Sequence, residues 1–142
     1  MIAGPRGPAL EVLRSQGSPV RDLAAEAWML ERAADEGRLM LLTASWTRPV
    51  VVLGYGQPVT DVDLEACRRL GMPVLRRLTG GTGVIHQGDL GLSLALPAGH
   101  PWTEGIVGLY GRFLEVLAPA LVAAGAAVAR LAEPIRSSRV RS

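Results

Sequence analysis

The sequence predicts an α+β domain in which a mixed, largely antiparallel sheet packs against helices. Helical and extended patterns follow one another in the order α-β-β-α-β-β-β-α-β, which suits a layered fold of this class. The chain has 142 residues, enough for one domain with an ordinary core. Apolar residues make up 49% and charged residues 20%, the balance of a globular protein.

The first helix is the most clearly marked element. Ser18 followed by Pro19 supplies a capping hydroxyl and a proline at the first helical position, and Gly37 ends the helical pattern. Its apolar face carries Leu23, Ala27, Leu30 and Ala34. The preceding residues 1–17 are rich in Gly and Pro and predict a flexible arm, with one helical turn around residues 10–13.

Extended segments dominate the middle of the chain. Residues 39–44 and 50–53 are rich in Leu and Val and predict neighbouring strands, with residues 45–49 as the turn of a hairpin. Thr60 is expected to cap a short helix over residues 61–70. Strands are also expected at residues 73–77, 84–86 and 90–96, the last with a core face of Leu90, Leu92, Leu94 and Leu96.

The last third of the chain predicts one long helix. Thr103 is expected to open this helix, and Pro119 should kink it or end it before Gly125. The face expected to point inward carries Ile106, Leu109, Tyr110, Phe113 and Leu117. One more strand is expected at residues 127–131, followed by a polar tail, residues 133–142, rich in Arg and Ser.

Composition argues against several classes of protein. No continuous apolar run reaches the roughly 18 residues of a membrane span, and the N-terminus lacks the apolar segment of a secretory signal. The formal charge of +2 is too small to indicate a nucleic-acid partner, and the single cysteine, Cys67, cannot form an internal disulfide. We therefore expect a cytoplasmic protein with no membrane and no nucleic-acid partner. The basic residues are all arginine, so the chain has no lysine amine for Schiff-base chemistry or phosphate contacts.

Residues 76–86 carry the strongest chemical pattern. A strand delivers Arg76 and Arg77 into a glycine-rich stretch, where a ligand can approach the main chain and successive amides can point at oxygen atoms. Because side chains alternate along a strand, we expect Arg77 to face the ligand and Arg76 to lie in solvent or on a helix. His86 could donate a hydrogen bond to the ligand or orient the loop. An isolated glycine cluster is also typical of an ordinary hairpin turn.

A longer pattern includes this segment. The signature R-R-x-[ST]-G-G-x-x-V-x-H is filled by Arg76, Arg77, Thr79, Gly80, Gly81, Val84 and His86, and residues 49–57 and 63–74 are similar at the expected spacing. On these residues the chain resembles the catalytic domain shared by biotin and lipoate protein ligases, in particular lipoate–protein ligase A and the octanoyltransferases, over about residues 20–132. Thr82 departs from the third consecutive glycine that many members have, and Gln87 departs from the aspartate that commonly follows the histidine.

The resemblance implies an α+β sheet-and-helix domain over residues 18–132, expected to be incomplete, that acts in protein lipoylation. It implies binding of a lipoyl or octanoyl group, or of an acyl-adenylate, and ATP with magnesium if the protein is of the ligase type. It implies a lipoyl domain or an acyl carrier protein as the partner. No metal ligands are expected among the residues themselves. The implied substrate-binding residues are Gln57, Arg77, Thr79, Gly80, Gly81, Thr82, Gly83 and His86.

The catalytic groups of the family do not match residues of this chain. The family's essential lysine and the cysteine nucleophile of its transferase branch are expected beyond Ser142, so these residues should bind an acyl group without completing its transfer. A non-catalytic acyl-binding module or partner subunit is the alternative. Cys67 is expected to be a small packed residue and His100 a solvated turn residue. Trp46 is expected to be a packing residue that could border the acyl tunnel.

Overall fold

The computed structural model describes residues 9–15 and 17–128, which fall into two units: the first ends at His100 and the second begins at Pro101. Unit 1 contains β1 (Leu10–Arg14), α1 (Pro19–Glu36), β2 (Leu39–Ser45), β3 (Val50–Leu53), η1 (Val59–Asp61), α2 (Leu64–Arg69), β4 (Val74–Arg76), β5 (Val84–His86) and β6 (Leu90–Ala95). Unit 2 contains η2 (Pro101–Thr103) and α3 (Ile106–Ala123). The tail expected at residues 133–142 lies outside the described residues.

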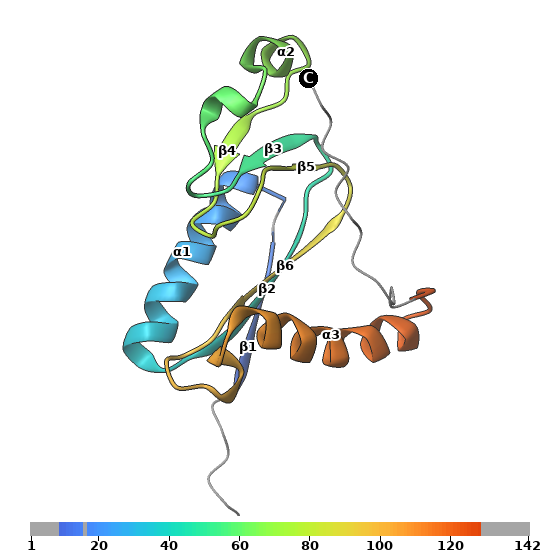
Figure 1. Ribbon diagram of the computed structural model, residues 1–142. Helices are drawn as coiled ribbons and strands as arrows, with labels where there is room; N and C mark the ends of the chain where they lie inside the picture. Colours follow the sequence, from blue (N-terminus) through green and yellow to red (C-terminus); the bar gives the residue numbers. More distant parts are fainter. Residues whose placement is uncertain (1–8, 16, 129–142) are drawn as a thin grey trace, which may run out of the picture. The chain divides into compact units, whose positions relative to one another are not determined.

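The strands of unit 1 form two three-stranded sheets (Figure 1). In the first sheet β2 is central, parallel to β1 and antiparallel to β6. In the second sheet β3 is central, parallel to β4 and antiparallel to β5. The predicted α+β class with mixed strand directions is therefore confirmed, although the strands divide into two sheets.

The strands β2 and β3 follow one another in the sequence but belong to different sheets. The hairpin expected over residues 39–53 is therefore wrong. Instead β2 pairs with β6, with Met40 opposite Ala95 and Ser45 opposite Leu90. The Leu and Val pattern predicts two strands but not which strands they pair with. An apolar strand can bury its side chains next to β3 or next to β6 equally well.

The N-terminal segment also differs from the prediction. Residues 10–14 form β1, not a helical turn in a flexible arm, and this strand pairs with β2 with Leu10 opposite Leu39. The pairing continues past the strand, because the amide of Ser15 donates to the carbonyl of Thr43 at 2.8 Å. Inter-strand hydrogen bonds override the weak local preference of so short a segment. Residues 1–8 and 16 of the expected arm lie outside the described residues.

The helix α1 covers one face of the first sheet and has the predicted ends. The Ser18 side chain accepts a hydrogen bond from the amide of Arg21, Pro19 lies in the first turn, and Gly37 takes a left-handed φ of 67°. One core forms where this helix meets the sheet. Its buried members are Met29, Ala33, Met40, Leu42 and Ala95.

The leucines of β6 do not form this core. In the register of β2 with β6, Ser93 and Ala95 pair with the core residues Leu42 and Met40, so Leu92 and Leu94 point to the opposite face. Leu90 is 59% exposed, and the predicted leucine core is wrong in direction. A period of two identifies the two faces of a strand but not which face a helix covers. Here α1 packs against the face of β6 that carries the small residues Ser93 and Ala95.

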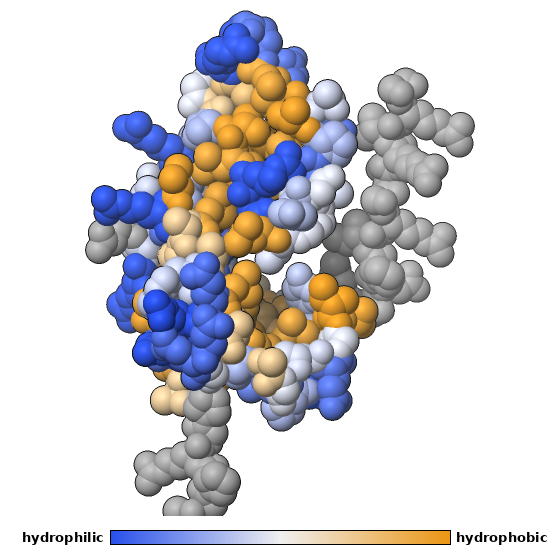
Figure 2. All heavy atoms as spheres, turned by 90° about the vertical axis from the view of Figure 1, so that its left-hand side faces the viewer, coloured by the Kyte–Doolittle hydropathy of each residue, from blue (hydrophilic) through white to orange (hydrophobic). Residues whose placement is uncertain are grey.

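Two separate short helices take the place of the single helix predicted over residues 61–70. Residues 59–61 form η1, and α2 begins only at Leu64, with the Asp63 side chain accepting a 2.8 Å hydrogen bond from the amide of Ala66. The cap is therefore Asp63 and not Thr60. Only Cys67 of α2 is buried, as expected for a small packed residue. Figure 2 shows this end of the molecule, at the top of the view, as hydrophilic, with a hydrophobic surface below it.

A second core contains a buried charge. Its buried residues are Ala44, Trp46, Val50 and Val52, and Leu23 and Leu75 pack against them. Asp22, in the first turn of α1, is 5% exposed and is the one buried charged side chain among the described residues. Its Oδ2 accepts hydrogen bonds from Ser15 Oγ at 2.5 Å and from Trp46 Nε1 at 2.6 Å. These donors and the positive end of the helix dipole stabilise the carboxylate.

Unit 2 consists of η2 and α3, and Arg112 Nη1 donates to the carbonyl of Pro101 at 2.6 Å. The helix begins at Ile106, not at Thr103, and continues through Pro119 to Ala123. No residue of α3 is buried, and Ile106 and Tyr110 of the face expected to point inward are 69% and 63% exposed. The pattern shows which face is apolar but not whether a surface covers it. Residues 127 and 128 form no strand, and the rest of the strand expected there lies outside the described residues.

The length and mean hydropathy of α3 meet the criterion for a membrane-spanning helix, although its apolar residues do not form one continuous run. Among the described helices, it is the one long and apolar enough to cross a membrane, with 18 residues and a mean hydropathy of 1.6. The apolar core helix of a soluble protein meets the same criterion. Length and composition therefore assign no environment to this helix.

We predict that Trp46→Phe lowers the free energy of unfolding by about 1–3 kcal/mol. The substitution removes the indole N–H and leaves the buried Asp22 carboxylate with one donor fewer. Trp28→Phe is the matched control, because Trp28 is 40% exposed, and it should change stability by about 0.5 kcal/mol or less. Urea unfolding of the two variants checks this, and equal losses would show that the Asp22 hydrogen bond is not the cause.

Candidate functional site

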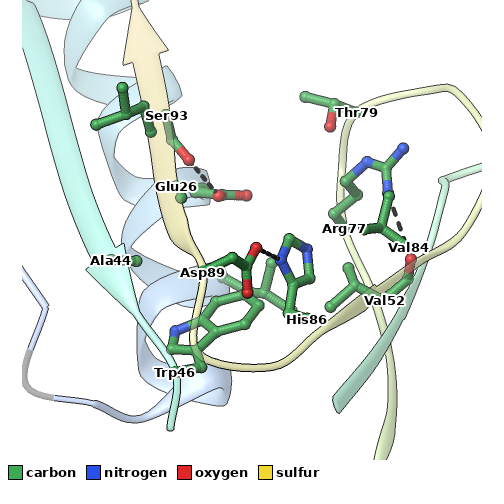
Figure 3. A pocket seen from close by; sticks show the side chains of 13 residues that line it. Glu26, Ala44, Trp46, Val52, Arg77, Thr79, Val84, His86, Asp89 and Ser93 are labelled. Carbon is green, nitrogen blue, oxygen red and sulfur yellow. Dashed lines mark hydrogen bonds and ion pairs between the residues drawn. The ribbon is translucent and has the colours of Figure 1, made fainter. Parts of the chain in front are cut away.

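Residues from α1, both sheets and the loop after β4 line a cavity of about 270 Å³ in unit 1. Figure 3 shows Arg77 and Thr79 on one side of it, Glu26 and Ser93 on the other, and Trp46, His86 and Asp89 at its base. The lining residues are Leu23, Glu26, Ala44, Trp46, Val52, Arg77, Thr79, Val84, His86, Asp89, Gly91, Leu92 and Ser93.

The structure brings three of the predicted site residues to this cavity: Arg77, Thr79 and His86. The others, Gly80, Gly81, Thr82, Gly83 and Gln57, are not part of its lining. They lie in two loops, residues 54–58 and 78–83, which follow β3 and β4. The predicted set therefore divides into residues that border the cavity and residues that build its surroundings.

His86 is held from two sides. Its Nδ1 lies 2.6 Å from Asp89 Oδ2, and its ring makes an edge contact with Trp46, with 4.8 Å between ring centroids and 77° between ring planes. With Nδ1 engaged by Asp89, Nε2 is the ring atom left for a ligand. The hydrogen bond from His86 lowers the pKa of the Asp89 carboxyl. The cavity therefore has an imidazole whose orientation is set by a carboxylate and an indole.

The two arginines have separate tasks. Arg77 Nη2 donates to the carbonyls of Gly80 at 2.7 Å and Thr82 at 3.0 Å, and Nη1 to that of Val52 at 3.3 Å. Arg76 is exposed, as expected, but it is not merely solvated. Its Nη1 donates to the carbonyls of Gly54, Tyr55 and Gln57 at 2.6, 2.8 and 2.7 Å.

The loops after β3 and β4 are in close main-chain contact. A β-carbon at Gly54 would lie 1.9 Å from the carbonyl oxygen of Gly81, so only glycine fits there. The amide of Tyr55 donates to the carbonyl of Thr79 at 2.9 Å. A β-carbon at Gly83 would lie 3.0 Å from Gln57 Oε1. Gln57 therefore packs against the glycine-rich loop and does not reach the cavity.

Carbonyl orientation determines where the loop amides point. The carbonyl of Gly80 and the amide of Gly81 belong to one planar trans peptide and point in opposite directions, as do the carbonyl of Thr82 and the amide of Gly83. Because Arg77 takes both carbonyls, both amides point away from its guanidinium. Within the described part of the chain, no main-chain carbonyl accepts a hydrogen bond from either amide. Such amides are available to an anion.

Several cavity residues were not predicted from the sequence. Asp89 follows His86 by three residues, a spacing that could have suggested the pair. Glu26 lies four residues after Asp22 on α1, and its Oε1 accepts a 2.5 Å hydrogen bond from Ser93 Oγ. Nothing in the sequence links Glu26 with Ser93, because only the packing of α1 on the first sheet brings the two side chains together. Among the described residues, no group of three His, Cys, Asp or Glu side chains could hold a metal ion.

The remaining candidates are placed as follows. Trp46 is both a core residue, 8% exposed, and part of the cavity wall, which agrees with both roles considered for it. Cys67 is buried and lies outside the cavity lining. His100 follows a turn and is half-buried, and it too lies outside the lining.

The sequence matches one protein family. The model of the lipoyl protein ligase A/B catalytic domain matches residues 18–138. The chain belongs to this family. Among its relatives are octanoyltransferases LipM from Carboxydothermus hydrogenoformans, 39% identical over 83 residues, and from Moorella thermoacetica, 35% identical over 105 residues. The matches include 58% and 72% of this chain but 31% and 38% of the relatives, so the chain matches about a third of their length.

Solved structures show the same fold. A Thermoplasma acidophilum protein with bound lipoic acid has a TM-score of 0.67 at 22% identity, over 92% of this chain and 55% of that one. A lipoate-protein ligase A bound with ATP has a TM-score of 0.70 at 21% identity, over 92% and 54%. A bipartite lipoate protein ligase from T. acidophilum, studied with its E2 lipoyl domain, has a TM-score of 0.68 at 23% identity, over 88% and 48%.

We predict that Gly54→Ala destabilises the protein by about 3 kcal/mol or more, because the new methyl group would overlap the main-chain carbonyl of Gly81. Gly56→Ala is the matched control, since a β-carbon there meets no atom within 4 Å. The control should change the free energy of unfolding by about 0.5 kcal/mol or less. Denaturant unfolding separates the two, and a tolerated Gly54→Ala would show that the loops can move apart.

The pH dependence of Asp89 provides another test. Its pKa lies below the ordinary value of 3.8, so its hydrogen bond to His86 contributes stability above that pH. The contribution is lost as the pH falls through the lowered pKa, and it should be small because the side chain is 45% exposed. Carboxyl NMR should give a titration midpoint below 3.8 that rises in His86→Gln. A midpoint unchanged by that substitution would contradict the pairing.

Proposed function

We propose that this domain binds the acyl chain of an octanoyl or lipoyl group as part of a protein-lipoylation enzyme. The cavity carries the proposal. Leucine and valine side chains supply apolar walls, and Arg77, Thr79 and His86 supply polar groups. An acyl chain with a polar head group has the same division. The octanoyltransferases among the relatives, and the structural neighbour with bound lipoic acid, support this ligand class.

The size of the cavity bears on which part of the ligand enters it. Its volume of about 270 Å³ is below the roughly 300–1,000 Å³ of most small-molecule sites. We infer that the acyl chain fills the cavity and that the phosphate of an acyl-adenylate lies outside it, against the glycine-rich loop. The amides of Gly81 and Gly83, which point away from Arg77, would meet that phosphate.

The chain's own groups suit binding more than transfer. His86 Nε2 would contact the acyl carboxyl or carbonyl oxygen, in an orientation set by Asp89 and Trp46. Acyl transfer is also accelerated by a cation or by preorganised hydrogen-bond donors where negative charge develops. The chain has no lysine, and the guanidinium of Arg77 is engaged by loop carbonyls. In our proposal, the groups that complete transfer are not among these residues and are supplied from elsewhere, for example by a partner subunit.

The absence of lysine, together with the engagement of Arg77 by loop carbonyls, also favours a second candidate function. A domain that keeps the acyl site but lacks the transfer cation could act as an acyl-binding module or as one subunit of a two-part enzyme. The partner in either case would be a lipoyl domain or an acyl carrier protein. A structural neighbour is a bipartite lipoate ligase studied with its E2 lipoyl domain, which supports this class of partner. ATP with magnesium would apply only to the ligase type.

Calorimetric titration with octanoate, lipoate and a non-hydrolysable octanoyl-adenylate analogue tests the binding proposal. We expect all three to bind, the analogue most tightly because only it also reaches the loop amides. Thr79→Trp, which places an indole in the cavity wall, should weaken octanoate binding at least tenfold. Thr47→Trp, the same substitution at an exposed threonine outside the lining, should leave the affinity unchanged. No binding of any acyl ligand by a folded sample would overturn the proposal.

A transfer assay separates the two candidate functions. The chain is incubated with a lipoyl domain and either octanoyl carrier protein or lipoate with ATP and magnesium, and the domain's mass is followed. Acylation of the lipoyl domain supports an enzyme complete in these residues. Binding without acylation supports the acyl-binding module or subunit.

A further inference from the structure

We propose that Arg76 is a positioning residue that sets the shape of the acyl site from outside the cavity. The inference rests on the proposed acyl-binding function and deepens it. Arg76 does not line the cavity, yet its guanidinium donates to the main chain of a loop that builds the surroundings of the site. Its role would differ from that of Arg77, which borders the cavity itself.

One nitrogen of Arg76 lies within hydrogen-bond distance of three carbonyl oxygens. Nη1 lies 2.6 Å from the carbonyl oxygen of Gly54, 2.8 Å from that of Tyr55 and 2.7 Å from that of Gln57. Three carbonyl oxygens that point at one place repel one another, because each carries partial negative charge. A cation at that place stabilises the arrangement. The conformation of the loop after β3 therefore depends on a charge supplied by β4.

Fixing the carbonyl of Gly54 also fixes a contact between the two loops. The amide of Tyr55 belongs to the same peptide plane and points the opposite way, where it donates to the carbonyl of Thr79 at 2.9 Å. The Thr79 side chain lines the cavity. A continuous path therefore runs from Arg76 through the peptide joining Gly54 and Tyr55 to a residue that borders the ligand site.

The neighbouring arginines Arg76 and Arg77 donate hydrogen bonds to different loops. Arg76 is the last residue of β4 and Arg77 is the residue after it, and each donates to carbonyls of one loop: residues 54–57 for Arg76, and Gly80 and Thr82 for Arg77. The close contact of Gly54 with Gly81 requires both loops to hold their positions. Loss of Arg76 should therefore alter the site although the residue touches no ligand.

Hydrogen exchange of the full chain tests the structural part of the proposal. In Arg76→Met, the amides of Tyr55 and Gln57, which donate to the carbonyls of Thr79 and Gly54, should exchange at least tenfold faster than in the wild type, whereas those of β2 and β6 should not change. Arg69→Met is the matched control: it removes an exposed arginine of α2 and should change none of these segments. Unchanged exchange at residues 55–57 in Arg76→Met would overturn the proposal.

Ligand affinity tests the functional part. Arg76→Met should bind the octanoyl-adenylate analogue at least tenfold more weakly, Arg76→Lys should recover part of the loss because it keeps a cation, and Arg69→Met should remain within twofold of wild type. If Arg76→Met does not fold, Arg76→Gln, which keeps hydrogen-bond donors but carries no charge, decides by the same two measurements. Its exchange at residues 55–57 should be faster than in the wild type. Wild-type affinity in Arg76→Met, or wild-type exchange in Arg76→Gln when Arg76→Met is unfolded, would overturn the proposal.

The failure of this inference is distinct from that of the proposed function. If the wild type binds no acyl ligand, the acyl-binding function fails, and the exchange of residues 55–57 still decides whether Arg76 positions the loops. If the wild type binds and Arg76→Met binds equally well, the function stands and the role of Arg76 is excluded.

Discussion

The carboxylate of Asp22 is buried and takes donors from two segments that lie apart from it in the sequence. Ser15 comes from the end of β1, and Trp46 comes directly after β2. A buried carboxylate without such donors would be strongly unfavourable, so the chain segments that supply them are fixed together. Trp46 in turn contacts His86, and His86 contacts Asp89. The orientation of the imidazole in the cavity therefore depends on a charge in the core.

The other half of the site depends on main-chain packing. The loops after β3 and β4 approach so closely that Gly54 has no room for a side chain, and their carbonyls turn toward two adjacent arginines. In this arrangement the arginines act on the protein's own carbonyls, and the glycine amides remain available for an anion. The chain's membership in the lipoyl protein ligase A/B catalytic-domain family is the background to the acyl site that we propose here.

The sequence predicts these features unevenly. Caps, breaks and periodicity are local, so α1 and its ends at Ser18 and Gly37 could be predicted, and so could the strands themselves. Pairing is not local: the separation of β2 from β3 and the strand at residues 10–14 follow from contacts between distant segments. The same holds for the site. Arg77, Thr79 and His86 were found from one continuous motif, whereas Glu26 and Ser93 meet only through the fold.

The strand β1 has a consequence for how this chain can be handled. It covers one edge of β2, whose residues 39–43 would otherwise present unpaired amides and carbonyls. An uncovered edge is a template for intermolecular strand pairing and aggregation. The Gly- and Pro-rich start of the chain gives no hint of this protection and would be an obvious place to shorten an expression fragment. Fragments that begin after residue 14 would lose the strand that covers this edge of β2.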